Sequence, residues 1–204
     1  MKTLVILTLL FCSIGSYTQN KFKEGYIITL KKDTIKGLVM EQTAVEAVSN
    51  CQFKTSESDP VQTFQIGFLE GYGFIRNGKN FVNHQIKFKN GTTHRGYFER
   101  LTSGRVTLYY YINEIDGNVT YFLFEKEGEE PIYITNKRTE IPKEEREDGL
   151  YYKKMLRKLF EECPPLKEDI NNTLFNKKSF TQIAKKYNSM MGAIENISLN
   201  MVEP

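Results

Sequence analysis

Hydrophobic and polar residues alternate in short runs from Gly25 to Thr135, which is the period of a β-strand with one buried face. Polar breaks separate the runs, and three of these breaks carry the Asn-Gly or Asp-Gly pairs that favour tight hairpin turns. These pairs are Asn77-Gly78, Asn90-Gly91 and Asp116-Gly117. The pattern predicts about ten strands joined mainly by hairpins, and therefore an antiparallel sheet arranged as a sandwich or as a rolled sheet.

Beyond position 142 the hydrophobic residues recur with the 3.6-residue period of an amphipathic helix. A first helix is predicted from about Leu150 to Cys163, where Pro164-Pro165 ends it. A second helix is predicted to begin at Ser179, whose hydroxyl starts a capping box. The hydrophobic faces comprise Tyr151, Tyr152, Met155, Leu156, Leu159, Phe160 and Cys163 in the first helix, and Phe180, Ile183, Ala184, Tyr187, Met190, Met191 and Ile194 in the second.

The first 19 residues have the form of an export signal. Lys2 supplies a positive charge, Thr3 to Phe11 is an almost unbroken hydrophobic run, and small residues follow it. The run is too short for a membrane span, which needs about 20 residues. We therefore expect residues 1–19 to be removed. The mature chain, without a transmembrane span, is then periplasmic, associated with the outer membrane, or secreted.

Taken together, these patterns predict an α+β protein. Residues 1–19 are the signal peptide, 20–141 a β-rich domain and 142–204 a C-terminal helical region. A helix with one hydrophobic face is marginal alone in water and needs a surface on which to bury it. We expect both C-terminal helices to pack on the sheet, which is the nearest such surface.

Composition adds two constraints. The chain is 40% hydrophobic and 13% aromatic, which is enough for a hydrophobic core and argues against disorder. Its formal net charge of +3 falls to +2 without the signal peptide, which holds one lysine and no acidic residue. A charge so close to zero gives no case for a nucleic-acid partner.

Three cysteines occur in the sequence, and one of them, Cys12, lies in the signal peptide. The remaining two are Cys51, in a predicted strand, and Cys163, at the end of the first predicted helix. In an oxidising compartment two such thiols can form a disulfide. The alternative is two separate buried thiols, and the sequence leaves both open.

The chain contains two histidines, His84 and His94, on neighbouring predicted strands. A three-residue loop, 89–91, pairs Ile86 with His94 and places both histidines on one face. A two-residue loop of Asn90-Gly91 places them on opposite faces, and the sequence does not decide between the registers. No Cys, Asp or Glu stands beside them at ligand spacing, so no metal site is predicted.

No catalytic motif is present: the chain lacks G-x-S-x-G, H-E-x-x-H and a phosphate-binding loop. We therefore predict no catalytic or cofactor-binding residues. Glu70, Glu99 and Glu114 are candidates for paired carboxylates, but a β protein of this size commonly has such residues. Tyr109 and Tyr111 share one side of their strand. They form either an exposed aromatic surface for sugar or peptide contacts, or buried rings with hydroxyl partners.

Several stretches together resemble uncharacterised exported proteins that are common in Bacteroidetes-type Gram-negative bacteria. They are GYIITLKKDTIKG at 25–37, FERLTSGRVTLYYY at 98–111 with YFLF at 121–124, Cys163-Pro164, and KKYN at 185–188. These motifs are strands and turns. The resemblance implies a bacterial envelope or secreted protein, and it implies no activity and no functional residues.

Three functions fit these observations. The first is a non-enzymatic envelope or secreted module that binds an envelope protein or a glycan. The second is a small-ligand-binding protein built on a rolled sheet, and the third is a hydrolase whose active site the sequence does not reveal. An exposed aromatic or edge-strand surface favours the first, an internal cavity the second, and a cleft with convergent carboxylates or histidines the third.

Overall fold

The computed structural model of this chain describes residues 21–88, 91–113, 119–146 and 150–192. The predicted signal peptide lies outside the described residues. So do Asn90 and the Asp116-Gly117 pair of two predicted turns, as well as Ile194 of the second predicted helix.

Ten strands form one antiparallel sheet in the order β10-β9-β8-β7-β6-β5-β1-β2-β3-β4. The predicted β-rich α+β class and the antiparallel sheet are confirmed, whereas the two-sheet sandwich is wrong because all ten strands belong to one sheet. The strands are β1 (Phe22–Thr29), β2 (Thr34–Met40), β3 (Asn50–Lys54), β4 (Gln62–Gln65), β5 (Leu69–Phe74), β6 (Asn80–Lys87), β7 (Thr93–Thr102), β8 (Val106–Asn113), β9 (Val119–Lys126) and β10 (Ile132–Thr135).

A short helix that the sequence analysis missed, α1 (Ala44–Ser49), connects β2 to β3. Thr43 and Glu46 form a reciprocal capping box at its start, and this Thr-x-x-Glu pattern was visible in the sequence. The hydroxyl of Tyr72 on β5 donates a 2.6 Å hydrogen bond to the Ala47 carbonyl, which fixes the helix against the sheet.

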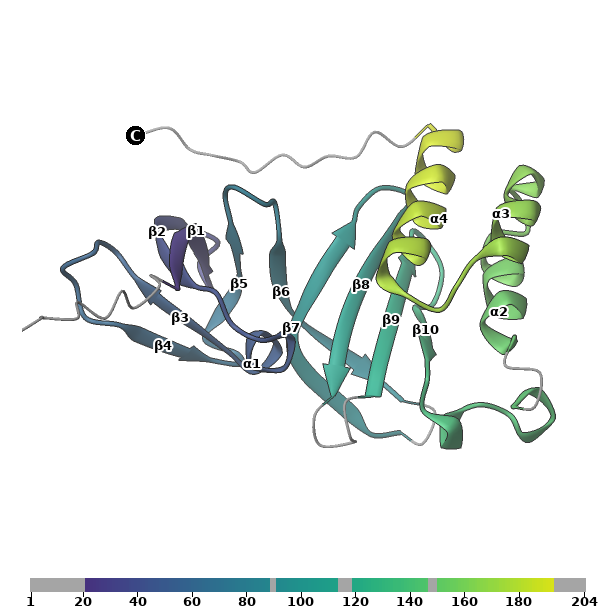
Figure 1. Cartoon of the computed structure of the whole chain (residues 1–204), viewed down its shortest axis with the longest axis horizontal. Coiled ribbons are helices and arrows are strands. Elements are labelled where there is room, and N and C mark those ends of the chain that lie inside the picture. The colour runs from purple at the N-terminus through teal and green to yellow at the C-terminus, as the bar shows by residue number, and fades with distance from the viewer. Residues whose placement is uncertain (1–20, 89–90, 114–118, 147–149, 193–204) are drawn as a thin grey trace, which may run out of the picture.

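The N-terminal strands curl until the edge strand β4 approaches β7. The Tyr97 hydroxyl on β7 donates to the Gln65 carbonyl of β4 at 2.9 Å, although β6, β5, β1, β2 and β3 lie between them in the sheet. Figure 1 shows this curled part as one end of the molecule. Its buried core consists of Ile27, Val39, Ala47, Cys51, Phe53, Leu69, Tyr72, Phe74, Phe81 and Tyr97.

Helices lie along one face of the C-terminal strands (Figure 1). Where two helices were predicted, the described residues of this region form three α-helices: α2 (Tyr151–Leu159), α3 (Lys167–Asn172) and α4 (Lys177–Met190). Single turns of 3₁₀ helix occupy Arg138–Glu140, Lys143–Glu145 and Pro164–Leu166. The Asn176 side chain, rather than Ser179, caps the start of α4.

Helices and strands share one hydrophobic cluster on this face. The strand residues are Val106, Leu108, Phe122, Phe124 and Ile134, and the helical region adds Tyr151, Tyr152, Leu156, Leu159, Phe160, Cys163, Leu166, Ile170, Phe180, Ile183, Ala184 and Tyr187. Asn188 adds polar bonds, since its side chain bonds both the N–H and the C=O of Val106, at 2.9 Å each.

The other face of the C-terminal strands is covered by the β6–β7 hairpin, which bends across it. The Phe88 ring, just beyond β6, lies 5.0 Å from the Tyr121 ring on β9 and 5.5 Å from the Tyr133 ring on β10. The third buried cluster therefore joins the hairpin, the C-terminal strands and Val48 of α1. Its residues are Val48, Ile86, Phe88, Phe98, Tyr111, Tyr121 and Leu123.

We predict that Leu156→Asp unfolds or aggregates the whole protein. Leu156 is fully buried in the cluster between α2 and the strands. Truncating such a residue costs about 2–5 kcal/mol, and the substituted carboxylate adds a buried charge. Urea denaturation measures the effect, with Lys158→Asp on the exposed side of the same helix as the control. If both variants unfold at the urea concentration of the wild type, α2 contributes nothing to the stability of the sheet.

Candidate functional site

A hollow of about 330 Å³ lies where β7 separates from β8. The two strands pair at Thr102–Leu108, Arg100–Tyr109 and Glu99–Tyr110. Among the described residues the ladder ends there, although β7 continues to pair with β6 as far as Thr93. The hollow is thus a consequence of one strand leaving its neighbour.

The lining of the hollow comes from four segments: the end of α1, the residue after β4, the first half of β7 and the end of β8. The lining residues are Val48, Ser49, Ile66, His94, Arg95, Tyr111, Ile112 and Asn113. Gly96 permits this close approach of α1, β7 and β8. A Cβ at position 96 would lie 2.7 Å from the Tyr111 ring and 3.1 Å from the Val48 carbonyl oxygen.

A side-chain hydrogen bond spans the separated strands. Asn113, only 2% exposed, lies on β8, and its Nδ2 is 3.0 Å from His94 Nδ1 on β7. An amide NH₂ can only donate, so with the amide as placed His94 Nδ1 is the acceptor. The neutral ring then carries its proton on Nε2, which has no hydrogen-bond partner among the described residues.

Arg95 supplies the only charged group other than a histidine among the described residues that line the hollow. Its side chain is exposed, and within the described part of the chain it has no ion-pair partner. No carboxylate belongs to the described lining. The hollow therefore presents two donors, the Arg95 guanidinium and the His94 Nε2–H, beside the hydrophobic side chains of Val48, Ile66 and Ile112.

His84 belongs to a separate polar cluster on the same face. Its Nε2 lies 2.8 Å from a Glu125 carboxylate oxygen on β9, and its ring packs at 4.9 Å from the Tyr109 ring and 5.5 Å from the Phe98 ring. Burial, reinforced by the Glu125 charge, raises the pKa of Tyr109 to about 12. The cluster joins β6 to β9 and holds the hairpin over the sheet.

The structure decides the register that the sequence left open. Ile86 pairs with His94, and the Phe88 N–H donates to the Thr92 carbonyl at 2.8 Å. Both histidines consequently share a face, as the three-residue loop predicts, yet each has its own partners. No group of three or more His, Cys, Asp or Glu side chains in the described part of the chain could hold a metal ion.

Tyr109 and Tyr111, the candidates for an exposed aromatic surface, pack against the third buried cluster instead, Tyr111 as a core residue and Tyr109 at its margin. Tyr111 is only 8% exposed and stacks on Phe98 with ring centroids 4.5 Å apart. Tyr109 is half-buried against His84. The β6–β7 hairpin covers the face on which both rings lie, and a single sequence does not reveal that cover.

The considered disulfide between Cys51 and Cys163 is absent, because both cysteines are free and buried. Cys51 lies in the core of the curled N-terminal strands, and Cys163 lies in the cluster between helices and sheet. Cys163 lies between α2 and the 3₁₀ turn at Pro164–Leu166 and not in the predicted helix, so its place on the predicted hydrophobic face did not indicate proximity to Cys51. The Cys163 thiol instead contacts the Met190 sulfur at 3.6 Å.

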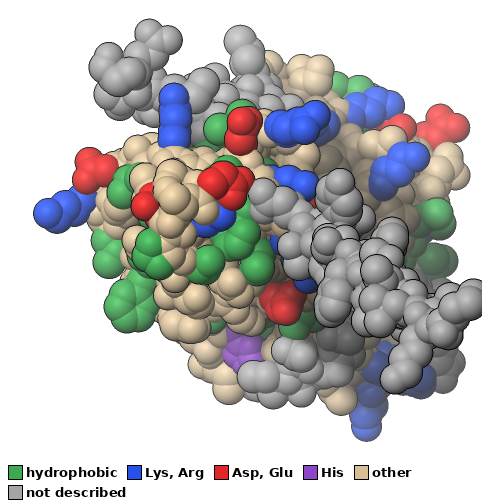
Figure 2. Space-filling view, turned by 60° about the vertical axis from the view of Figure 1, so that its left-hand side comes forward, with side chains coloured by type: hydrophobic (Ala, Val, Ile, Leu, Met, Phe, Trp, Pro, Cys, Tyr) green, Lys and Arg blue, Asp and Glu red, His purple; other side chains and the backbone are tan. Residues whose placement is uncertain are grey.

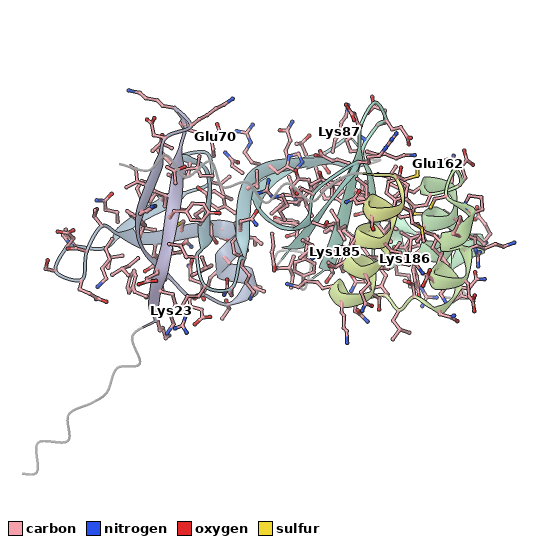
Figure 3. All side chains as sticks on the ribbon, turned by 90° about the horizontal axis from the view of Figure 1, so that it is seen from above. Lys23, Glu70, Lys87, Glu162, Lys185 and Lys186 are labelled. Atoms are coloured by element: carbon pink, nitrogen blue, oxygen red, sulfur yellow. The ribbon has the colours of Figure 1, made fainter. Side chains whose placement is uncertain are left out.

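The candidate carboxylates do not form a described pair. Glu99 on β7 bonds the Lys177 ammonium of α4 at 2.5 Å, and Glu114 lies outside the described residues. Figure 3 places Glu70 in the N-terminal half of the molecule, away from the helices. A second hollow, of about 280 Å³, lies between the β5–β6 turn, β7 and α4, and Lys79, Glu99 and Lys185 are among its lining residues.

Comparison with family models, with curated proteins and with solved structures gives no match for this chain. The resemblance to exported Bacteroidetes-type proteins stays a prediction. Among the described helices, none has both the length and the hydrophobicity needed to cross a membrane.

Arg95 and Asn113 were not predicted as site residues from the sequence, and His94 was considered only as a metal ligand, with no metal site predicted. Adjacent residues of a strand, such as His94 and Arg95, point to opposite faces of a sheet, so the sequence pattern does not predict that they share a site. They border one hollow because it opens at the edge of β7. The only sequence signal was Gly96, a glycine inside a strand pattern, which indicates a close backbone approach.

We predict that Cys51 resists alkylation by iodoacetamide at pH 8 in the folded protein. Burial raises its pKa to about 12, so almost no thiolate is present at that pH, and the thiolate is the nucleophile. Peptide mapping after labelling, with and without urea, measures the reaction. Thr55→Cys adds an exposed thiol as a positive control. Rapid labelling of Cys51 without urea contradicts the prediction. An intact mass lower by two hydrogens contradicts its premise, because a disulfide would then protect Cys51 in place of burial.

Proposed function

We propose that this protein is an exported, non-enzymatic binding protein whose ligand site is the hollow between β7 and β8. The observation that carries the proposal is the convergence of His94, Arg95 and Asn113 on one hollow with hydrophobic walls. Its volume of about 330 Å³ is at the lower end of the range for small-molecule sites. A few polar groups among hydrophobic side chains are typical of such sites.

The contacts of the two histidines support binding rather than hydrolysis. His84 is engaged by Glu125 and by two aromatic rings, and His94 is engaged by Asn113 and Phe88. Within the described residues no Ser hydroxyl or Cys thiol is bonded to either imidazole, as a nucleophile–base pair requires. A hydrolase remains the third of the predicted functions.

Export is part of the proposal and is supported by the Lys2-led hydrophobic run and by the family resemblance. We expect the mature protein, isolated from the native host, to begin between residues 15 and 20. N-terminal sequencing of envelope and cytoplasmic fractions measures this. An intact Met1 on soluble cytoplasmic protein overturns the export proposal and leaves the binding proposal standing.

A second candidate is an interaction module that contacts a macromolecule through the curled N-terminal strands. Phe68 is 66% exposed and Leu30 is 55% exposed. Leu30 directly follows β1 and Phe68 directly precedes β5. Because Thr29 pairs with Leu69 in these antiparallel strands, the two residues lie at the same end of the strand pair. Figure 2 shows hydrophobic side chains on the surface of this part of the molecule. In this case the partner is an envelope protein, and the hollow plays no part in binding.

The two histidines provide a direct test of the binding proposal. A proton NMR spectrum contains one Hε1 signal from each, so His94 reports on the hollow and His84 serves as an internal control. We expect at least one of three probes at millimolar concentration, hexanoate, hexylamine or glucose, to shift the His94 signal while the His84 signal stays in place. If no probe shifts His94, or if both signals move together, the hollow is not a ligand site.

A further inference from the structure

Arg95 and the ring of His94 offer hydrogen-bond donors to a ligand in the hollow. The Ser49 hydroxyl in the lining already donates to the Val45 carbonyl at 3.1 Å. Asn113 occupies His94 Nδ1, which leaves the Nε2–H as the free group of the ring. Arg95 has five N–H donors and no acceptor, and it lacks an ion-pair partner within the described part of the chain. A ligand that satisfies both residues must therefore bring acceptor atoms.

The charge of the lining residues indicates whether the acceptor atoms of the ligand are neutral or negatively charged. The described lining has one guanidinium and no carboxylate, so its field favours an anion. Guanidinium and carboxylate match in geometry, because two parallel N–H groups meet two oxygens. Apart from Ser49 and Asn113, the remaining lining is mainly hydrophobic and suits a hydrocarbon body rather than a second charged group.

We propose that the hollow between β7 and β8 binds the carboxylate of a small organic acid, with Arg95 and His94 as its donors and a hydrocarbon body against Val48, Ile66 and Ile112. This inference rests on the proposed function, because it names the ligand class of the same site. The carboxylate belongs either to a free acid or to the C-terminus of a peptide, which presents the same two oxygens.

The first experiment compares hexanoate with hexylamine and hexan-1-ol, which have the same hydrocarbon chain, by the Hε1 signals of the full mature protein. We expect hexanoate alone to shift the His94 signal, with His84 unaffected. Equal shifts with hexylamine or hexan-1-ol overturn the carboxylate assignment and leave the hollow as a binding site. Absence of any shift overturns both.

The second experiment separates the role of Arg95 from a general effect of charge. Arg95→Gln is expected to weaken hexanoate binding roughly tenfold, as loss of one charge-assisted hydrogen bond predicts. Lys87→Gln removes the same charge from the same hairpin, from an exposed β6 residue labelled in Figure 3, and is expected to leave binding unchanged. Equal weakening in both variants overturns the role of Arg95.

A third comparison identifies the source of the carboxylate. An acetylated Ala-Ala-Leu peptide with a free C-terminus and its C-terminal amide are titrated under the same conditions. Tighter binding of the free peptide than of hexanoate assigns the site to chain termini, and tighter binding of hexanoate assigns it to free acids. Binding of the amide as strong as that of the free peptide overturns the carboxylate proposal.

Discussion

The pairing of β7 with two different neighbours is the constraint on which the rest of this structure depends. β7 pairs with β6 from Thr93 to Arg100, but with β8, within the described part of the chain, only from Glu99 to Thr102, where the register shifts. The C-terminal end of β7 is therefore hydrogen-bonded to the C-terminal strands, whereas its N-terminal end diverges from β8. Without that departure the β6–β7 hairpin could not bend across the sheet, and the N-terminal strands could not curl separately.

Aromatic packing on both faces of β7 stabilises the divergence of this strand from β8. On one side Phe98 stacks on Tyr111, and on the other Tyr97 packs edge-on against Tyr72 at 5.3 Å. Successive residues of β7 thus serve two different cores, which alternation along a strand makes possible. Where the backbone ladder stops, the hydrogen bond between Asn113 and His94 continues the connection through side chains. Side chains, rather than backbone groups, bridge the gap, and they place a few polar atoms beside the hydrophobic walls of the hollow.

The helices are attached to the sheet by polar contacts as well as by their shared hydrophobic cluster. Lys126 on β9 forms ion pairs with Glu129 at 2.6 Å and with Glu162, after α2, at 2.7 Å. The Tyr187 hydroxyl of α4 donates to the same Glu162 carboxylate at 2.5 Å. Burial raises the pKa of this carboxyl, but the hydrogen bonds from Lys126 and Tyr187 outweigh it and hold the pKa below its usual value. The described C-terminal helices are therefore tied to the strands at several points.

The sequence by itself determined the α+β class, the antiparallel hairpins and the main strand positions, because alternation and Asn-Gly turns are local properties of the chain. It also contained the Thr43–Glu46 capping box. Only the tertiary structure decided that Tyr111 is covered, that Cys51 and Cys163 lie in separate cores, and that His94 and Arg95 border one hollow. Each of these depends on where β7 leaves β8, which is a contact between distant segments that no local pattern encodes.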